Sequence, residues 1–307
     1  RNAVNSFDGL YKYWQEVFNV SVLNREFYKE LSNWYFWALK KVTFPGASLK
    51  ADQNGLSKED ERVKEHNAKN LIRLLTRLLF VWFVKEKNLI PEELFDTTYI
   101  REELLQEFQP QRLGNLFDKQ ANGSTYYKAV LQNLFFATLN RTMGKREFRK
   151  NKHHMNVTTL MRYESCFKDP GKFIKLVEDI VPFMNGGLFE CLDKPDPKLR
   201  GPKGGDVIIY QDGFSDRNDN KLIVPDYIFF GDEEHVDLSE DYGSKSKTYK
   251  SAAVKGLINI LNSYKFTITE NTPIEEDVAL DPELLGRVFE NLLASYTPEK
   301  KTTARKQ

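Results

Sequence analysis

Apolar residues predominate in the stretch 71-LIRLLTRLLFVWFV-84. Arg73, Thr76 and Arg77 are its polar exceptions, so a helix drawn through it is apolar on most sides. A helix of that kind belongs in the interior of a domain. We therefore expect residues 71–84 to be the core of a central, buried helix.

Helical spacing of apolar residues continues on both sides of this segment. The central helix is expected to start at a capping box, Ser57 with Asp60, and to stop before Pro91. Further helices are predicted where apolar side chains recur three and four residues apart. The positions along one face of these helices are Phe7, Leu10, Tyr11, Trp14 and Phe18; Phe27, Leu31, Trp34 and Ala38 after a cap at Asn24; Tyr127, Leu131, Leu134, Phe135 and Thr138 within 125–140; Val254, Leu257, Ile258, Leu261 and Tyr264; and Leu284, Leu285, Val288, Phe289 and Leu292, after a cap at Asp281 and with Pro282 at the first helical position. A further helix is predicted at residues 171–181.

The sequence changes in character between residues 185 and 246. Gly, Pro and Asp surround short β-prone runs there, at 207–210 and 227–230. The predicted fold class is mainly α, a multi-helix domain with a small β-containing insertion around residues 185–246. This division assigns residues 1–184 to the first part of the helical domain and residues 247–307 to a helical return.

Composition restricts the possible partners. The 307 residues include 45 Lys plus Arg and 44 Asp plus Glu, which gives a formal net charge of +1. A chain of this length can bury a substantial core, but it exerts no strong whole-molecule attraction on nucleic acid or an anionic membrane. Any contact with DNA is therefore expected to be local.

Other sequence features indicate the cellular compartment of the protein and whether the chain is part of a longer one. Cys166 and Cys191 lie far apart without CxxC spacing, which argues against a zinc site or a disulfide framework and favours the reduced cytoplasm. The longest apolar run, residues 78–84, is far shorter than the roughly 20 residues that cross a bilayer, so no membrane association is expected. Because the chain starts at Arg1 without Met and stops in a basic stretch at Gln307, we expect it to be part of a longer protein.

No cofactor or metal site is predicted. The glycines at 186–187 and 201–205 match neither GxGxxG nor GxxxxGK[ST], and we interpret both as turns. The segment 185–190 is expected to be a specific turn with Gly at positive φ. The pair His153 and His154 lacks a third ligand at metal spacing.

The sequence also contains a formal match to a nuclease pattern. A nuclease site of this kind requires two acidic residues that bind a metal and a lysine near the attacking water. Asp196, Asp219 and Lys221 match this requirement formally. The intervening segment holds only turn-rich sequence around one short strand. We therefore expect a surface loop at these positions.

A basic segment, residues 145–152, is the main charge feature of the chain. It is expected either to contact DNA phosphates without reading bases or to be a solvated loop. Its five positive residues are Lys145, Arg146, Arg149, Lys150 and Lys152. Arg73 and Arg77, by contrast, are expected to pair with carboxylates inside the domain, because a buried guanidinium demands partners.

Several stretches resemble the helical region that precedes the methyltransferase domain in type IIG restriction-modification enzymes and in the related methylases of BREX phage-defence systems. They are VPFMNGGLFE at 181–190, residues 266–278, and above all ALDPELLGRVFENLLASYTPEKKTTARKQ at 279–307. Residues 71–95 and 131–140 also resemble helices of the family. In the family, the next element is TGSxYTP-like and helps to build the S-adenosylmethionine pocket; this chain stops just short of it.

The resemblance implies a parent protein with a nuclease domain upstream and an adenine N6-methyltransferase with a target-recognition domain downstream. The parent would act on double-stranded DNA with S-adenosylmethionine, and with Mg²⁺ if the nuclease is present. The chain itself has no FxGxG loop and no NPP[YF] motif, which in the family holds the flipped-out adenine. No catalytic, cofactor-binding or metal-binding residue is therefore carried over.

The expected function is a non-catalytic helical connector that positions the nuclease and methyltransferase domains on DNA. The alternative is a protein-interaction module of a phage-defence DNA methylase without nuclease activity, which an upstream sequence without a nuclease motif would favour. A stand-alone nuclease is the third hypothesis, and it requires Asp196, Asp219 and Lys221 to converge in space.

Overall fold

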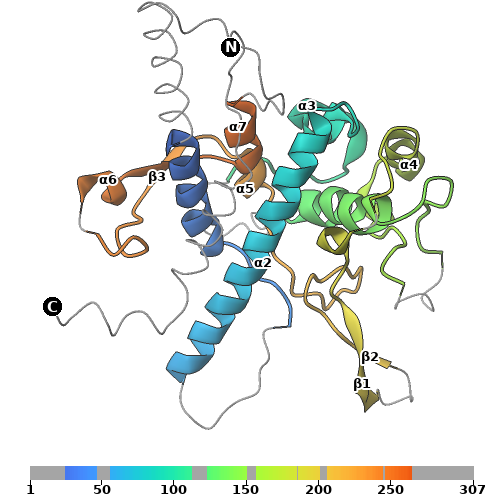
Figure 1. The fold of residues 1–307 in the computed structure, drawn as a ribbon, viewed down its shortest axis with the longest axis horizontal. Coiled ribbons are helices and arrows are strands. Elements are labelled where there is room, and N and C mark those ends of the chain that lie inside the picture. Colours follow the sequence, from blue (N-terminus) through green and yellow to red (C-terminus); the bar gives the residue numbers. More distant parts are fainter. Residues whose placement is uncertain are drawn as a thin grey trace, which may run out of the picture. The chain divides into compact units, whose positions relative to one another are not determined.

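The computed structural model of the chain describes residues 25–46, 56–112, 123–150, 157–184, 186–200, 206–244 and 246–264. The chain divides into two compact units, coloured along the sequence in Figure 1. Unit 1 is Arg1–Trp37 with Glu233–Gln307, and unit 2 is Ala38–Asp232. The predicted helices around 7–18 and 281–292, the cap at Asn24 and most of the predicted loop at 43–55 lie outside the described residues.

Helix α2 (Leu56–Lys85) confirms the predicted central helix of unit 2. Leu71, Leu75 and Leu78 are fully buried, and Trp82 is 1% exposed. Each such side chain contributes about 1.5–3 kcal/mol on leaving water, so this face of the helix stabilises the unit strongly. The helix stops ahead of Pro91, as expected. The side chains of the predicted capping box lie outside the described part of the structure.

The predicted helix at 125–140 is present and is wound in wide π-type turns, η4 (Tyr126–Leu131) and η5 (Asn133–Leu139). The Gln132 N–H, for example, donates to the carbonyl oxygen of Tyr127. All side chains from residue 129 to residue 139 are buried. The sequence pattern indicated one apolar face, but unit 2 surrounds this helix on nearly all sides.

The prediction of a strand at 227–230 is wrong, because these residues form the short helix α5 (Tyr227–Phe230). All four side chains are buried, and the Tyr126 ring lies 5.3 and 4.7 Å from the rings of Phe229 and Phe230. The N–H groups of Phe229 and Phe230 donate to the Asp226 carbonyl oxygen. A helical turn supplies these backbone partners locally, and tertiary packing overrides the β propensity of the run.

Shorter elements complete unit 2. Strands β1 (Lys194–Arg200) and β2 (Asp206–Ile209) pair antiparallel, so the strand expected at 207–210 is confirmed. Helix α4 (Pro170–Glu178) confirms the helix expected at 171–181, and the Asp169 carboxylate caps its first turn. The remaining elements are η1 (Glu92–Phe95), α3 (Thr97–Tyr99), η2 (Ile100–Leu104), η7 (Glu164–Cys166) and η8 (Gly187–Phe189).

Unit 1 is built on the helical residues from 25 onward, where Phe27, Leu31 and Trp34 are fully buried, as their spacing predicts. The Asn33 amide donates to the Ala253 carbonyl oxygen at 3.2 Å and ties this helix to the second strand pair. The other elements are β3 (Glu234–Val236), α6 (Lys247–Lys250), β4 (Ala252–Val254) and α7 (Leu257–Asn262). The helix predicted from Val254 to Tyr264 thus starts at Leu257, because Val254 belongs to β4.

Helices dominate the described residues, whose strands form two short antiparallel pairs, so the mainly α class is as predicted. The pair β3–β4 extends beyond residue 246, past the region where β structure was expected. The division of the chain at residues 184 and 246 stays a prediction. Among the described helices, none has both the length and the apolarity needed to cross a membrane.

Candidate functional site

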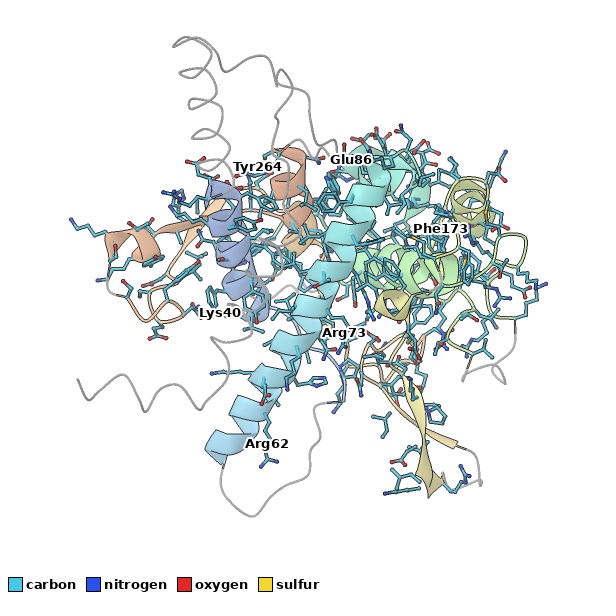
Figure 2. The ribbon with its side chains drawn as sticks, viewed as in Figure 1. Lys40, Arg62, Arg73, Glu86, Phe173 and Tyr264 are labelled. Carbon is cyan, nitrogen blue, oxygen red and sulfur yellow. The ribbon has the colours of Figure 1, made fainter. Side chains whose placement is uncertain are left out.

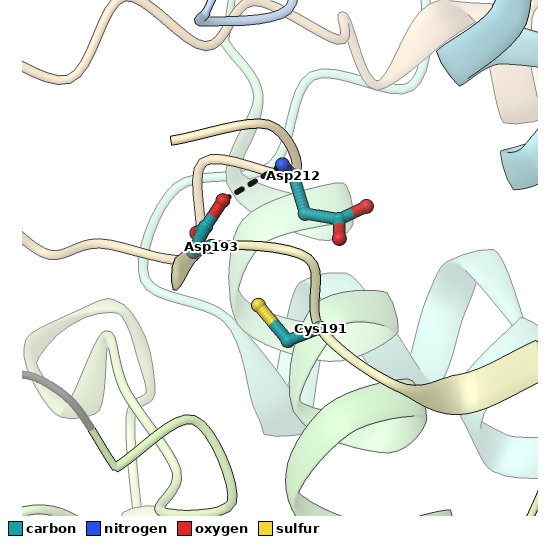
Figure 3. Close-up of side chains that lie close together, drawn as sticks. All are labelled: Cys191, Asp193 and Asp212. Atoms are coloured by element: carbon teal, nitrogen blue, oxygen red, sulfur yellow. Dashed lines mark hydrogen bonds between the residues drawn. The ribbon is translucent and has the colours of Figure 1, made fainter. Parts of the chain in front are cut away.

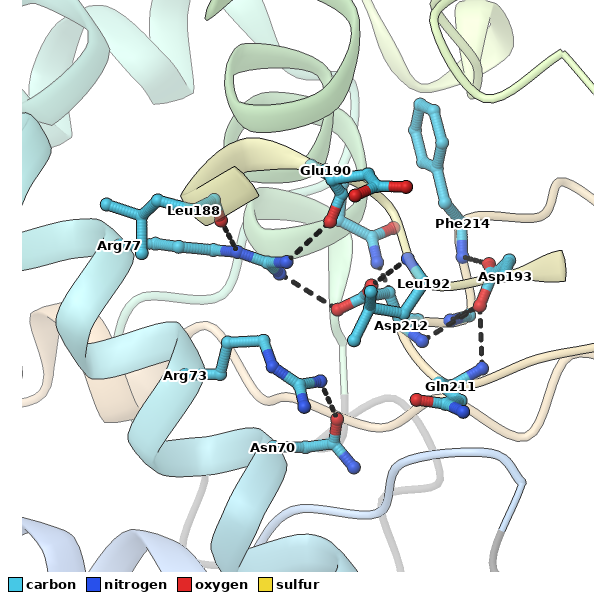
Figure 4. A network of polar contacts seen from close by, with 12 residues as sticks. Asn70, Arg73, Arg77, Leu188, Glu190, Leu192, Asp193, Gln211, Asp212 and Phe214 are labelled. Carbon is cyan, nitrogen blue, oxygen red and sulfur yellow. Dashed lines mark hydrogen bonds and ion pairs between the residues drawn. The ribbon is translucent and has the colours of Figure 1, made fainter. Parts of the chain in front are cut away.

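Arg77 is the centre of a buried polar network in unit 2 (Figure 4). Its side chain projects from α2 and forms an ion pair with Asp212, with 2.8 Å between Nη1 and Oδ1. Both side chains are almost completely buried. The prediction that Arg77 pairs with a carboxylate inside the domain is therefore confirmed.

The same guanidinium holds the segment at 186–190. Its Nε donates to the Leu188 carbonyl oxygen at 2.8 Å, and its Nη2 donates to the Glu190 carbonyl oxygen at 2.9 Å. A planar fork with donors on three sides suits this arrangement. The expectation of glycine at positive φ is wrong here, since Gly186 has φ −149° and the described residues with positive φ lie elsewhere. Arg77, rather than glycine, positions this segment.

Asp193 organises the adjoining turn, as Figure 4 shows. Burial raises the pKa of its carboxyl, and the N–H donors of the turn act in the opposite direction. The neighbouring Asp212 also accepts the Leu192 N–H at 2.7 Å on Oδ2. The donors to Asp193 are the N–H groups of Gln211 (2.6 Å), Asp212 (2.8 Å), Gly213 (3.1 Å) and Phe214 (2.7 Å).

Cys191, Asp193 and Asp212 bring one potential metal-ligand atom each to within 4.8 Å of one another (Figure 3). Metal binding by cysteine requires the thiolate, and burial raises the pKa of the Cys191 thiol far above its usual range. Every carboxylate oxygen of the two aspartates already accepts at least one N–H group. This donor set fits a structural polar network rather than a cation site.

Arg73, one turn before Arg77, has a weaker attachment. Figure 2 labels its position on α2. Arg73 is half-buried, and its Nη1 donates to the Asn70 side-chain oxygen at 2.8 Å (Figure 4). Burial lowers its pKa, and the nearby Asp212 raises it. Arg73 therefore bonds an amide, where the sequence predicted a carboxylate.

The basic segment is extended, and its side chains alternate between the interior and the surface. The Arg149 N–H donates to the Met161 carbonyl oxygen, and the Met161 N–H donates to that of Glu147, both at 3.0 Å. Lys145 and Lys150 are exposed, whereas Phe148 is buried. Lys152 lies outside the described residues, as do the histidines at 153 and 154.

Arg146 points inward and is only 5% exposed. Its Nη1 and Nη2 donate to the carbonyl oxygens of Val177 and Val181, both at 2.7 Å, at the carboxyl end of α4. Glu178 lies 3.6 Å from its Nε. In this arrangement the Arg146 guanidinium cannot contact a phosphate without giving up buried hydrogen bonds, so Arg146 is not suited to the predicted DNA contact.

Arg149 is held by Asp216, whose two carboxylate oxygens lie 2.5 and 2.6 Å from Nη2. This pair lines an open cavity of about 600 Å³ together with Tyr163, Arg162 and Lys168. Tyr163 has φ 60° and ψ 35°, a left-handed conformation that costs a non-glycine residue about 1–3 kcal/mol. Its hydroxyl accepts the Ser215 N–H at 3.0 Å, which helps to hold this strained residue in place.

The nuclease pattern gains no support from the contacts of its members. Asp219 forms two hydrogen bonds to Arg217 at 2.8 Å, and Asp196 accepts the Lys198 N–H at 2.8 Å. Each carboxylate is thus bound within its own loop or strand. Lys221 is exposed.

Comparison with known proteins identifies one distant relative among curated sequences. A Methanocaldococcus jannaschii protein, named "Putative type II restriction enzyme and methyltransferase RM.MjaORFECS2P", is 24% identical over 244 residues. The chain is distantly similar to a restriction-modification protein. The match covers 76% of this chain but only 14% of the relative, so the chain corresponds to a small part of that protein. No family model and no solved structure matches the chain.

Sequence reasoning missed the acidic partners of the network and the conformation of Tyr163. Asp193 and Asp212 are hidden in a stretch that is rich in Asp, Gly and Pro, where acids usually occupy exposed turns. The only sequence signal for them was Arg77 itself, which required an acid without indicating which one. No pattern in the sequence distinguishes Tyr163 from the other tyrosines.

Proposed function

We propose that the chain is a non-catalytic helical connector of a type IIG restriction-modification protein. It would hold a nuclease domain and an adenine-specific methyltransferase domain at a fixed spacing on DNA. Support comes from the distant similarity to a restriction-modification protein. The observation that carries the proposal is the rigid mounting of the basic segment, whose inward residues are anchored while Lys145 and Lys150 face outward.

A rigid body is what a spacer requires. Packed helices transmit a fixed distance, whereas a flexible linker yields a broad distribution of distances. In unit 2, Arg77 ties α2 to the 186–190 segment, and Arg146 ties the basic segment to α4. Two exposed lysines on such a rigidly held segment would contact DNA phosphates without reading the base sequence. Contacts of this kind position a protein on the duplex.

Duplex binding by the 307-residue chain tests the DNA contact. The experiment measures fluorescence anisotropy at several salt concentrations for the wild type, for Lys145→Glu with Lys150→Glu, and for a control, Lys64→Glu with Lys87→Glu. The control changes the net charge equally, and its lysines are exposed on α2 and just after it. We expect the first variant alone to weaken binding and to reduce the salt slope by about two.

Absence of binding by the wild type at low salt would contradict the DNA contact and favour a protein-interaction module of a phage-defence methylase. The spacer role has a separate test in the complete parent protein, with unit 2 replaced by a flexible linker of equal span. A cleavage offset that becomes broad supports the role, and an unchanged offset refutes it.

A further inference from the structure

The β1–β2 hairpin is an exposed element of unit 2. In Figure 1 it extends away from α4 and from the helix at 125–139. Lys194, Lys198, Leu199, Arg200 and Ile209 are all exposed. A two-stranded ribbon is marginally stable by itself, and its exposed apolar side chains gain from a partner surface.

A bulge gives the hairpin its particular shape. Asp196 lies opposite Val207, and Arg200 lies opposite Asp206, so β1 contains three residues that have no counterpart in β2. A bulge of this kind moves side chains out of the ladder and redirects them. Lys198 and Leu199 belong to it, and Leu199 is 50% exposed.

The chemistry of the hairpin narrows the class of partner. Pro195 and Pro197 remove two N–H donors from β1, so this strand is a poor template for an added strand of another protein. Lys198 and Arg200 lie on either side of Leu199 in the sequence and are exposed beside it. Adjacent cations on either side of an exposed apolar side chain are complementary to a phosphate backbone that borders a groove.

We propose that the β1–β2 hairpin enters a groove of duplex DNA, with Lys198 and Arg200 at the phosphates and Leu199 inside the groove. A two-stranded antiparallel ribbon has the width that the major groove admits. The hairpin is a DNA-binding element separate from the basic segment. The inference rests on the proposed function in one respect, namely that the parent protein works on double-stranded DNA.

A photocrosslinking experiment tests the hairpin directly in the 307-residue chain. A benzophenone amino acid replaces Leu199 in one variant and Leu89, which is 43% exposed in a loop after α2, in the control. We expect a crosslink to duplex DNA at position 199 and none at position 89. Equal crosslinking at both positions, or none at 199 under conditions where the chain binds DNA, would overturn the proposal.

Charge reversal supplies an independent measurement. Lys198→Glu with Arg200→Glu is expected to weaken duplex binding about ten- to hundredfold near 0.1 M salt and to reduce the salt slope by about two. The control is the double variant at Lys64 and Lys87. If the wild type binds but this variant behaves like the control, the hairpin proposal fails and the connector stands. If the wild type itself does not bind, the DNA contact of the connector fails as well.

Discussion

Replacing Arg77 by lysine tests whether the buried network holds unit 2 together. The substitution keeps the positive charge and removes the planar fork that reaches Asp212, Leu188 and Glu190. A lysine ammonium at the end of a flexible stem cannot reach three acceptors placed around a guanidinium plane. Arg73→Lys is the matched control, since it makes the same change one turn away on α2.

The expected magnitude follows from the bonds that are lost. Each buried acceptor left without a donor costs about 1–3 kcal/mol, and Arg77→Lys leaves about two of them. Two such acceptors at about 1–3 kcal/mol each give an expected loss of about 2–6 kcal/mol. Arg73 is half-buried and makes one bond to Asn70, so its replacement is expected to cost less than about 1 kcal/mol.

Urea unfolding of the wild type and both variants, followed by tryptophan fluorescence and circular dichroism, gives the free energies of unfolding. We expect Arg77→Lys to lower the value by about 2–6 kcal/mol. Equal losses for the two variants, or a loss below about 1 kcal/mol for Arg77→Lys, would refute the view that the three bonds of Arg77 stabilise the unit.

Three further outcomes are expected. Burial raises the pKa of Asp226 from 3.8 to about 7, so its contribution to stability is complete below about 3.8 and declines as the pH rises through about 7. In the Asp226→Asn variant, the free energy of unfolding should therefore decrease less over that pH range than in the wild type. Urea titrations at several pH values measure this, and an unchanged pH dependence would contradict the prediction. Arg146→Met should lower the free energy of unfolding by about 2 kcal/mol, because buried carbonyl groups lose their donors. It should leave the salt slope of DNA binding, measured by fluorescence anisotropy, unchanged. A reduced slope would show that Arg146 contacts phosphate. Gly46→Ala should destabilise the protein more than Gly144→Ala, although both glycines have positive φ. A Cβ at Gly46 would lie 2.0 Å from the Tyr210 carbonyl oxygen, whereas a Cβ at Gly144 meets nothing within 4 Å. Equal melting temperatures of the two variants would count against that clash.

The basic segment illustrates where sequence analysis was insufficient. Five cations within eight residues indicate one patch of positive charge, whereas the extended backbone sends neighbouring side chains in opposite directions. Arg146 satisfies carbonyl groups at the end of α4, and Arg149 pairs with Asp216, so the exposed cations of the described part are Lys145 and Lys150. The contact with DNA itself stays a prediction.

The helical framework could be predicted from the sequence. The apolar run at 71–84, the helices near 125–140 and 171–181, and the buried positions Phe27, Leu31 and Trp34 follow from local periodicity, because a helix satisfies its own backbone and needs only one rule of spacing. Sequence also required that Arg77 have a partner.

The contacts between residues far apart in the sequence could not be predicted and depend on the tertiary packing. Asp212 lies 135 positions from Arg77 in the chain, and the donors to Asp193 come from a turn about 20 residues away. The aromatic run at 227–230 became helical because buried rings and the Asp226 carbonyl oxygen surround it, against its local preference. Contacts of this kind depend on the closure of long loops and on packing from several elements at once, which no local pattern encodes.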